Sequence, residues 1–207
     1  MNDVKALSED DAALSDINSF VHPYNSFNFF TTTYTNLKLV TLKITHNYSK
    51  QQVTDINQKV TEIEKAVIKP GMSDRDKIKA VHDYIINLTK YDKNRADTGV
   101  SSYQSNIAYG PLFEKYAICS GYTDAMAIFL HRWKIPNYKI TSDSHVWNLV
   151  YIDNKWLHLD LTFDDPILSN GKEIISSNYF LITTSQLLKL DQQEHNFNRD
   201  VFKEADY

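Results

Sequence analysis

The sequence lacks several features that mark large classes of protein. It has one cysteine among 207 residues, which excludes an internal disulfide and a metal cluster built on cysteines. No apolar run approaches the length of a membrane-spanning helix, the best being residues 125–130. Basic residues are not in excess, since 22 Lys and Arg against 26 Asp and Glu give a net charge of −4. That balance argues against a protein that mainly coats nucleic acid or an anionic membrane.

What is present is the composition of a globular protein. Hydrophobic residues make up 42% and charged residues 23%, which excludes disorder throughout the chain. Five glycines and five prolines contrast with 13 tyrosines and 10 phenylalanines, a skew that we attribute to genome composition. The first residues lack the basic and apolar stretches of a secretory signal. Two compartments therefore stay open: the cytoplasm, or an extracellular site reached through a signal outside this numbering.

Apolar spacing predicts two helices in the first half of the chain. Ser49 and Gln52 have the spacing of a capping box, and apolar residues then recur at steps of three and four up to residue 67. Ser73 starts a second helix over residues 74–90 with the same periodicity. A short helix or frayed arm is expected within residues 1–20.

The remaining segments predict strands and one further helix. Residues 27–47 are rich in β-formers around Thr35-Asn36 and predict a hairpin. Short strands are expected at 138–141, 145–152, 155–162 and 178–183, and Asp153-Asn154 is a suitable two-residue turn. Residues 91–110 form a predicted surface loop, residues 119–133 a helix with a broad apolar face, and the tail from 186 is polar. This order predicts the α+β class.

Cys119 lies where a loop turns into the helix of residues 119–133. The first turn of a helix has free N–H groups and a positive dipole end, and both favour a thiolate. A thiol pKa of about 8.5 falls toward the reactive range in such a place. On its own, a lone cysteine is more often a small buried hydrophobe.

Two adjacent strands supply a base and a carboxylate. If Ile152 pairs with Lys155 across the tight turn, His145, Trp147 and Asp160 share one face of the sheet. His145 and Asp160 are then diagonal neighbours on adjacent strands, with their backbones roughly 7–8 Å apart, so their side chains can reach each other. A cysteine at a helix start, with a histidine and an aspartate on adjacent strands, is the arrangement of a catalytic triad. The cysteine is the nucleophile, the histidine the base, and the aspartate the group that orients the histidine.

The motifs that carry these residues resemble the transglutaminase-like superfamily of papain-fold cysteine enzymes, in its bacterial branch. They are AYGPL at 108–112, AICSGY at 117–122, SHVWNLV at 144–150 and WLHLDLTFDDP at 156–166. The resemblance is close over about residues 70–185. It implies a papain/transglutaminase-like α+β core with the cysteine helix packed on an antiparallel sheet. We expect an N-terminal extension over residues 1–72 and a transglutaminase-like catalytic domain over 73–207.

The resemblance implies a triad of Cys119 as nucleophile, His145 as base and acid, and Asp160 as orienting group. Such enzymes attack an amide carbonyl, form a thioester, and pass the acyl group to an amine or to water, with no cofactor. The expected partner is a protein or peptide, attacked at a glutamine side chain or a peptide bond, with cell-wall peptides as a further class. By the same resemblance we expect a secreted or cell-surface setting.

Other residues near the motifs are weaker candidates. Tyr109 and Gln104 are candidate oxyanion donors or groove residues, and Trp147 is expected to wall the groove or shield the His–Asp pair. The sequence departs from the family pattern at Leu161, where proline is common, and at Phe163, where tryptophan is common. Both departures leave the triad intact.

Three alternatives stay open from the sequence. His158 shares the face of Asp160 and is a competing base, although a packed structural histidine is the commoner role. His145, His158 and Asp160 could together bind a metal, but the ordered cysteine motif explains the same residues better, so no metal is expected. A binding module with a silent triad is the alternative to an enzyme. Asp164-Asp165 lacks the spacing of a calcium loop and is interpreted as a capped turn.

Overall fold

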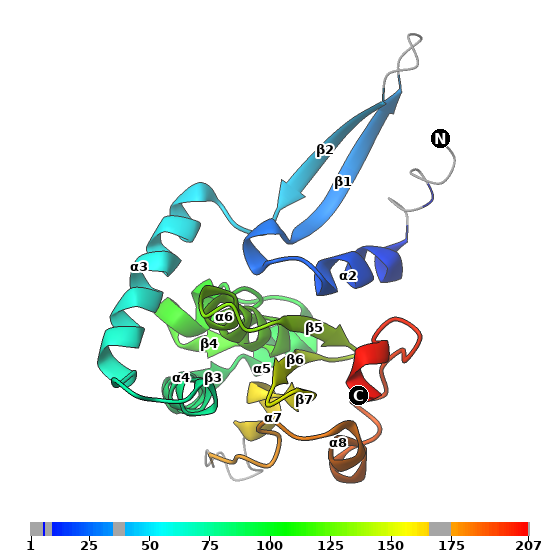
Figure 1. Ribbon diagram of the computed structural model, residues 1–207. Helices are drawn as coiled ribbons and strands as arrows, with labels where there is room; N and C mark the ends of the chain where they lie inside the picture. Colours follow the sequence, from blue (N-terminus) through cyan, green and yellow to red (C-terminus); the bar gives the residue numbers. More distant parts are fainter. Residues whose placement is uncertain (1–5, 7–9, 35–39, 166–174, 207) are drawn as a thin grey trace.

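The computed structural model describes residue 6 and residues 10–34, 40–165 and 175–206. Its elements in chain order are α2 (Asp11–Ser19), η1 (Pro23–Asn25), β1 (Phe27–Tyr34), β2 (Val40–His46), α3 (Lys50–Val67), α4 (Asp74–Leu88), β3 (Lys90–Tyr91), α5 (Lys93–Thr98), η2 (Gly110–Glu114), β4 (Tyr116–Ala117), α6 (Cys119–Arg132), β5 (Asn137–Thr141), β6 (Val146–Ile152), β7 (Lys155–Leu159), α7 (Leu161–Asp164), α8 (Thr184–Leu190) and η3 (Lys203–Asp206). The mixture of helices with an antiparallel sheet confirms the predicted α+β class (Figure 1). No helix among the described residues is long and apolar enough to cross a membrane.

The predicted capping signals set the starts of α3 and α4. The Ser49 hydroxyl accepts from the Gln52 N–H, and the Gln52 side chain accepts from the Ser49 N–H. Ser73 and Asp76 make the same reciprocal pair at the start of α4. The two helices pack on each other, α4 also packs on α6, and the apolar stripes of all three belong to the main core. The division at residues 72 and 73 stays a prediction.

The central sheet has the order β5-β6-β7, with antiparallel neighbours. Its β6-β7 register pairs Ile152 with Lys155, as the turn chemistry predicted. Asp153 and Asn154 both have positive φ, 53° and 60°, as the tight hairpin turn requires. Strand β7 ends at Leu159, three residues before the predicted end, because the next residue caps helix α7.

The two faces of this sheet are covered by different parts of the chain. Helix α6 packs on one face and joins the main core there (Figure 1). The other face buries a second cluster, in which Trp147 and Leu149 meet Leu187, Phe197 and Phe202 of the C-terminal segment. The polar tail predicted from residue 186 therefore contributes apolar anchors to the core.

Two other predictions differ from the structure, and one helix was not predicted. Residues 178–183 are not a strand: one isolated bridge joins Ile182 to His158, and Leu181 has a positive φ of 50°. The predicted loop 91–110 contains the last residue of β3 and the whole of the short helix α5. Helix α8 went unnoticed, although Thr183 and Gln186 form a capping box at its start.

The β1-β2 hairpin projects away from the rest of the molecule (Figure 1). Its register pairs Phe30 with Ile44 and Thr33 with Thr41, as expected for antiparallel strands. The predicted turn at Thr35-Asn36 lies outside the described residues.

Candidate active site

Cys119 is the first residue of helix α6 and is half-buried. The preceding residue, Ile118, makes no side-chain cap, and its carbonyl accepts from the Gly121 N–H at 3.0 Å. The N–H groups of Cys119 and Ser120 are therefore the ones that can face an anion. The Ile118 N–H donates to the Ser105 carbonyl at 2.9 Å, which fastens the neighbouring loop to the helix start. Gly121 is required there, because a Cβ would lie 2.2 Å from the Ser105 carbonyl oxygen.

His145 directly precedes strand β6 and faces both Asp160 and Cys119. Its Nε2 lies 2.6 Å from Asp160 Oδ2, which leaves Nδ1 for the hydrogen bond with the Cys119 thiol. Burial lowers the pKa of His145, but the charge of Asp160, its hydrogen bond and the contact with Cys119 together raise that pKa to about 10. The imidazole is thus held in its protonated form at neutral pH.

Asp160 is the N-cap of α7 and only 1% exposed. Its Oδ1 accepts from the N–H groups of Thr162 and Phe163, at 2.9 and 3.2 Å. Burial alone would raise the pKa of Asp160, but the charge and hydrogen bond of His145, with the hydrogen bond of His195, hold that pKa far below its ordinary range. The carboxylate therefore stays ionised beside the imidazole.

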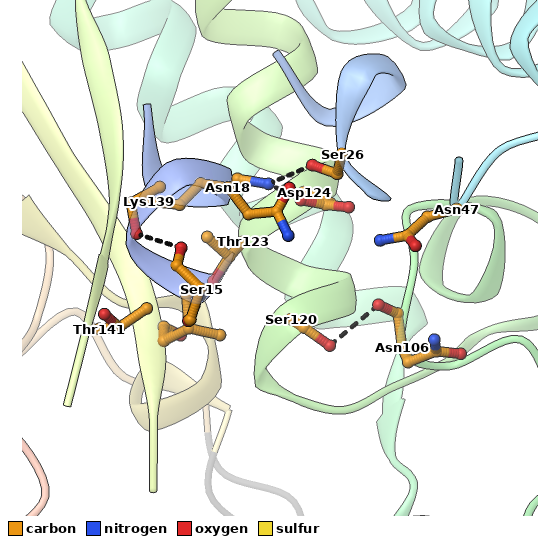
Figure 2. Close-up of a pocket in the computed structure, with 12 residues that line it drawn as sticks. Ser15, Asn18, Ser26, Asn47, Asn106, Ser120, Thr123, Asp124, Lys139 and Thr141 are labelled. Carbon is orange, nitrogen blue, oxygen red and sulfur yellow. Dashed lines mark hydrogen bonds and ion pairs between the residues drawn. The ribbon is translucent and has the colours of Figure 1, made fainter. Parts of the chain in front are cut away.

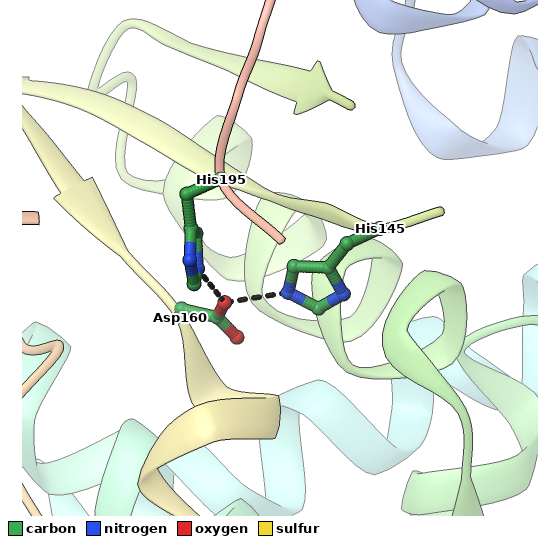
Figure 3. Close-up of side chains that lie close together, drawn as sticks. All are labelled: His145, Asp160 and His195. Atoms are coloured by element: carbon green, nitrogen blue, oxygen red, sulfur yellow. Dashed lines mark hydrogen bonds and ion pairs between the residues drawn. The ribbon is translucent and has the colours of Figure 1, made fainter. Parts of the chain in front are cut away.

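His195 is a residue of this site that sequence analysis missed. Its Nε2 lies 2.9 Å from the same Asp160 Oδ2 that binds His145, and the ring is fully buried (Figure 3). It lies 35 residues beyond Asp160, in a segment with no motif, so no local signal marked it. The ligand atoms of His145, Asp160 and His195 all lie within 4.8 Å of one another, a grouping that could hold a metal ion. A metal there would have to displace both N–H···O bonds that Asp160 Oδ2 now accepts.

Trp147, on strand β6, and His158, on strand β7, lie next to the His145, Asp160 and His195 side chains. The indole of Trp147 lies parallel to the His145 imidazole, at 5.5 Å between centroids and 14° between planes. Its Nε1–H donates to His158 Nδ1 at 2.9 Å, and His158 Nε2 bonds the Thr184 hydroxyl at 2.9 Å. Burial lowers the pKa of His158 to about 3. His158 is thus a neutral packed histidine whose ring bonds Trp147 and Thr184, not Asp160.

Gln104 and Tyr109 have other contacts. The Gln104 side chain accepts from the Gln52 amide at 2.5 Å and is exposed. The Tyr109 ring stacks on Phe113 at 4.4 Å between centroids. The structure does not bring either of them into contact with the His–Asp pair, and their role as oxyanion donors stays a prediction.

Tyr91 is a further neighbour of the nucleophile that the sequence did not single out. Burial, and then the nearby Cys119, Asp97, Asp92 and Glu194, raise the pKa of Tyr91 to about 12. Its hydroxyl therefore stays protonated and lies in the electrostatic neighbourhood of Cys119.

Asp164 and Asp165 anchor the chain just after the triad aspartate. Asp164 Oδ1 accepts from the Ser176 hydroxyl and the Tyr179 N–H, both at 3.0 Å, and Oδ2 bonds His82 Nε2 at 3.1 Å. Asp165 accepts from the Tyr122 hydroxyl at 2.5 Å. Both carboxylates thus bind protein groups, in keeping with a structural turn.

A polar cavity of about 170 Å³ lies beside the start of α6 (Figure 2). Ser120 and Val146, which follow Cys119 and His145 in the chain, line it. At its wall the buried Lys139 ammonium donates to Asp124 at 3.1 Å and to the Ser26 hydroxyl at 2.7 Å. The cavity therefore offers mainly neutral hydroxyl and amide groups, because the charges of Lys139 and Asp124 neutralise each other.

Comparison with known proteins supports the resemblance. Residues 61–161 match the family model of the Transglutaminase-like superfamily. A crystal structure described as a TGase is 19% identical, with a TM-score of 0.46, over 74% of this chain and 48% of its own. The structure described as "a Putative Cysteine Protease from Cytophaga hutchinsonii" is 15% identical, with a TM-score of 0.40, over 72% of this chain and 66% of its own. The chain thus spans about half the length of the first of these structures, and no curated protein matches it.

Proposed function

Because residues 61–161 match the family model of the Transglutaminase-like superfamily, we propose that this chain is a thiol-dependent enzyme that performs acyl transfer or amide hydrolysis. Cys119 is the nucleophile, His145 the base and acid, and Asp160 the group that orients His145. One observation carries the proposal: a single imidazole bonds the buried Asp160 carboxylate through Nε2 and the helix-terminal thiol on its other side.

In the first half of the reaction, the Cys119 thiolate attacks an amide carbonyl and forms a carbon–sulfur bond. His145 gives its Nδ1 proton to the departing amine as the carbon–nitrogen bond breaks, and a thioester remains. The N–H of Cys119, in the open first turn of α6, can donate to the transient oxyanion.

In the second half, an amine or water attacks the thioester and His145 accepts its proton. The carbon–sulfur bond breaks and Cys119 leaves as a thiolate. The proton now on His145 restores the pair of Cys119 thiolate and His145 imidazolium. Asp160 stabilises the imidazolium in both halves, and its bonds at Oδ1 keep the carboxylate from turning.

The substrate class that we propose is a protein or peptide, attacked at a glutamine side chain or a peptide bond. Cell-wall peptides are a second class to test. Whether an amine or water accepts the acyl group depends on what reaches the thioester.

The experiment measures the rate of Cys119 alkylation by iodoacetamide as a function of pH. The sequence holds one cysteine, so the signal reports Cys119 alone, and Cys119→Ala gives the blank. We expect fast labelling well below pH 8 in the native protein. In His145→Ala the midpoint should rise toward the free-thiol pKa of about 8.5. A native midpoint already near 8.5 that ignores His145→Ala would show that the triad is not assembled, and would favour the binding module.

Once the thiolate is established, two assays separate the reactions. Incorporation of a fluorescent primary amine into a glutamine-containing protein reports acyl transfer, and release of new amino termini reports peptide hydrolysis. Cys119→Ala should abolish whichever activity is found.

A further inference from the structure

The carboxylate of Asp160 receives two imidazoles on one oxygen. Oδ2 lies 2.6 Å from His145 Nε2 and 2.9 Å from His195 Nε2, while Oδ1 accepts two backbone N–H groups. An ionised carboxylate is an acceptor only, so each imidazole must present an N–H to it. His195 is therefore a second donor to the carboxylate that orients His145.

The surroundings of His195 indicate which of its nitrogens carries the proton. Its Nδ1 is buried and has no hydrogen-bond partner within the part of the chain that the structure describes. The nearest carboxylate oxygen given for it, Asp191 Oδ2, lies 3.9 Å away, beyond hydrogen-bond distance. A buried N–H without an acceptor is costly, so the neutral ring with its hydrogen on Nε2 fits this place best.

The ring is held by aromatic neighbours on several sides. Tyr179 stacks on it at 5.5 Å between centroids, and the rings of Phe163 and Trp147 approach at 4.6 and 4.8 Å. Trp147 and Phe163 also contact the His145 ring. The two imidazoles are thus packed into one aromatic enclosure around the buried carboxylate.

The segment that carries His195 is tied to the approach to His145. The hydroxyl of Ser142 donates to the Glu194 carbonyl, and that of Ser144 to the Glu194 carboxylate, both at 2.6 Å. These bonds join the residues just before His145 to the residue just before His195. The backbone segments that carry the two imidazoles are therefore held together.

We propose that His195 is a positioning residue: its Nε2–H holds Asp160 Oδ2 in the orientation that directs His145 Nδ1 at Cys119. The inference rests on the proposed function, since it assigns a role in the same triad. It acts through Asp160 and needs no contact with substrate.

The test compares two substitutions that differ in one hydrogen-bond donor. His195→Phe keeps a ring in the aromatic enclosure and removes the donor, whereas His195→Gln keeps an N–H donor near the position of Nε2. His82→Phe is the matched control, because it removes another fully buried imidazole that bonds a buried carboxylate, that of Asp164, without touching Asp160. Thermal unfolding of each variant reports the structural cost separately.

The readout is the pH midpoint of Cys119 alkylation by iodoacetamide. In His195→Phe we expect the midpoint to rise by about one unit, a roughly tenfold loss of rate on the acidic side. His195→Gln should restore most of the native profile, and His82→Phe should leave the midpoint in place even if it lowers the melting temperature. A folded His195→Phe with a native midpoint would overturn the proposal, as would equal shifts in the Phe and Gln variants.

A measurement on the native protein covers the case in which the variants do not fold. Proton NMR of a sample with ¹⁵N-labelled histidine should show two strongly downfield Nε2–H resonances, one for each bond to Asp160. A His195 ring protonated on Nδ1 alone would contradict the assignment. Failure of the proposed function is distinguishable, because the native midpoint would then be insensitive to His145→Ala, whatever His195 does.

Discussion

At the scale of single residues, Asp160 bears most directly on both stability and chemistry, since its buried carboxylate accepts from two imidazoles and two backbone amides. Asp160→Asn keeps the shape but presents an amide where the charge was. We expect a loss of about 3–5 kcal/mol in the free energy of unfolding, because breaking a buried ion pair strands its partner. Urea unfolding followed by tryptophan fluorescence measures it. The same variant should slow Cys119 alkylation at pH 6, and a variant as stable and as reactive as the native protein would contradict this account.

The raised pKa of His145 makes a second prediction at this scale. That pKa moves from 6.5 to about 10 on folding, so the protonated imidazole stabilises the folded state fully below pH 6.5. The contribution is lost as the pH rises through about 10. The difference in unfolding free energy between the native protein and His145→Gln should therefore shrink steadily from pH 6.5 to pH 10. A difference that stays constant across this range would show that His145 is neutral in the folded protein.

At the scale of elements, the start of α6 is packed closely against the loop that carries Ser105. A Cβ on Gly121 would lie 2.2 Å from the Ser105 carbonyl oxygen, so Gly121→Ala must push apart the helix start and the loop. We expect about 1–3 kcal/mol of destabilisation, and slower alkylation of Cys119, because the thiol moves relative to His145. Ser120→Ala is the control, since it removes only the hydroxyl bond to the Asn106 carbonyl. Similar alkylation rates in the two variants would disprove the coupling.

The elements also show which parts of the fold a sequence can predict. The caps at Ser49 and Ser73 and the turn at Asp153-Asn154 depend on residues at most three apart, and all were predicted. The register that brings His145 to Asp160 follows from that turn. His195 could not be predicted in this way, because it reaches Asp160 only through the packing of the C-terminal segment on the sheet. Helix α8 is seven residues long and too short for its periodicity to stand out.

At the scale of the whole molecule, the sheet separates two apolar clusters with different consequences for the site. The main core holds α3, α4 and α6, whereas the second cluster fixes the C-terminal segment that carries His195. Phe202 is fully buried in the second cluster and Phe129 in the main core. Phe202→Ala and Phe129→Ala should each lower the free energy of unfolding by about 3–5 kcal/mol.

Their effects on the site should nevertheless differ. Loss of Phe202 loosens the segment of Glu194 and His195, so we expect faster amide hydrogen exchange there and a higher pH midpoint for Cys119 alkylation. Loss of Phe129 leaves that segment packed against Trp147, and the midpoint should stay near the native value under conditions where both variants remain folded. The comparison separates global stability from the local order of the site, because the two variants are matched in residue type, burial and expected cost. Equal midpoints in the two variants would show that the second cluster stabilises the fold without governing the triad.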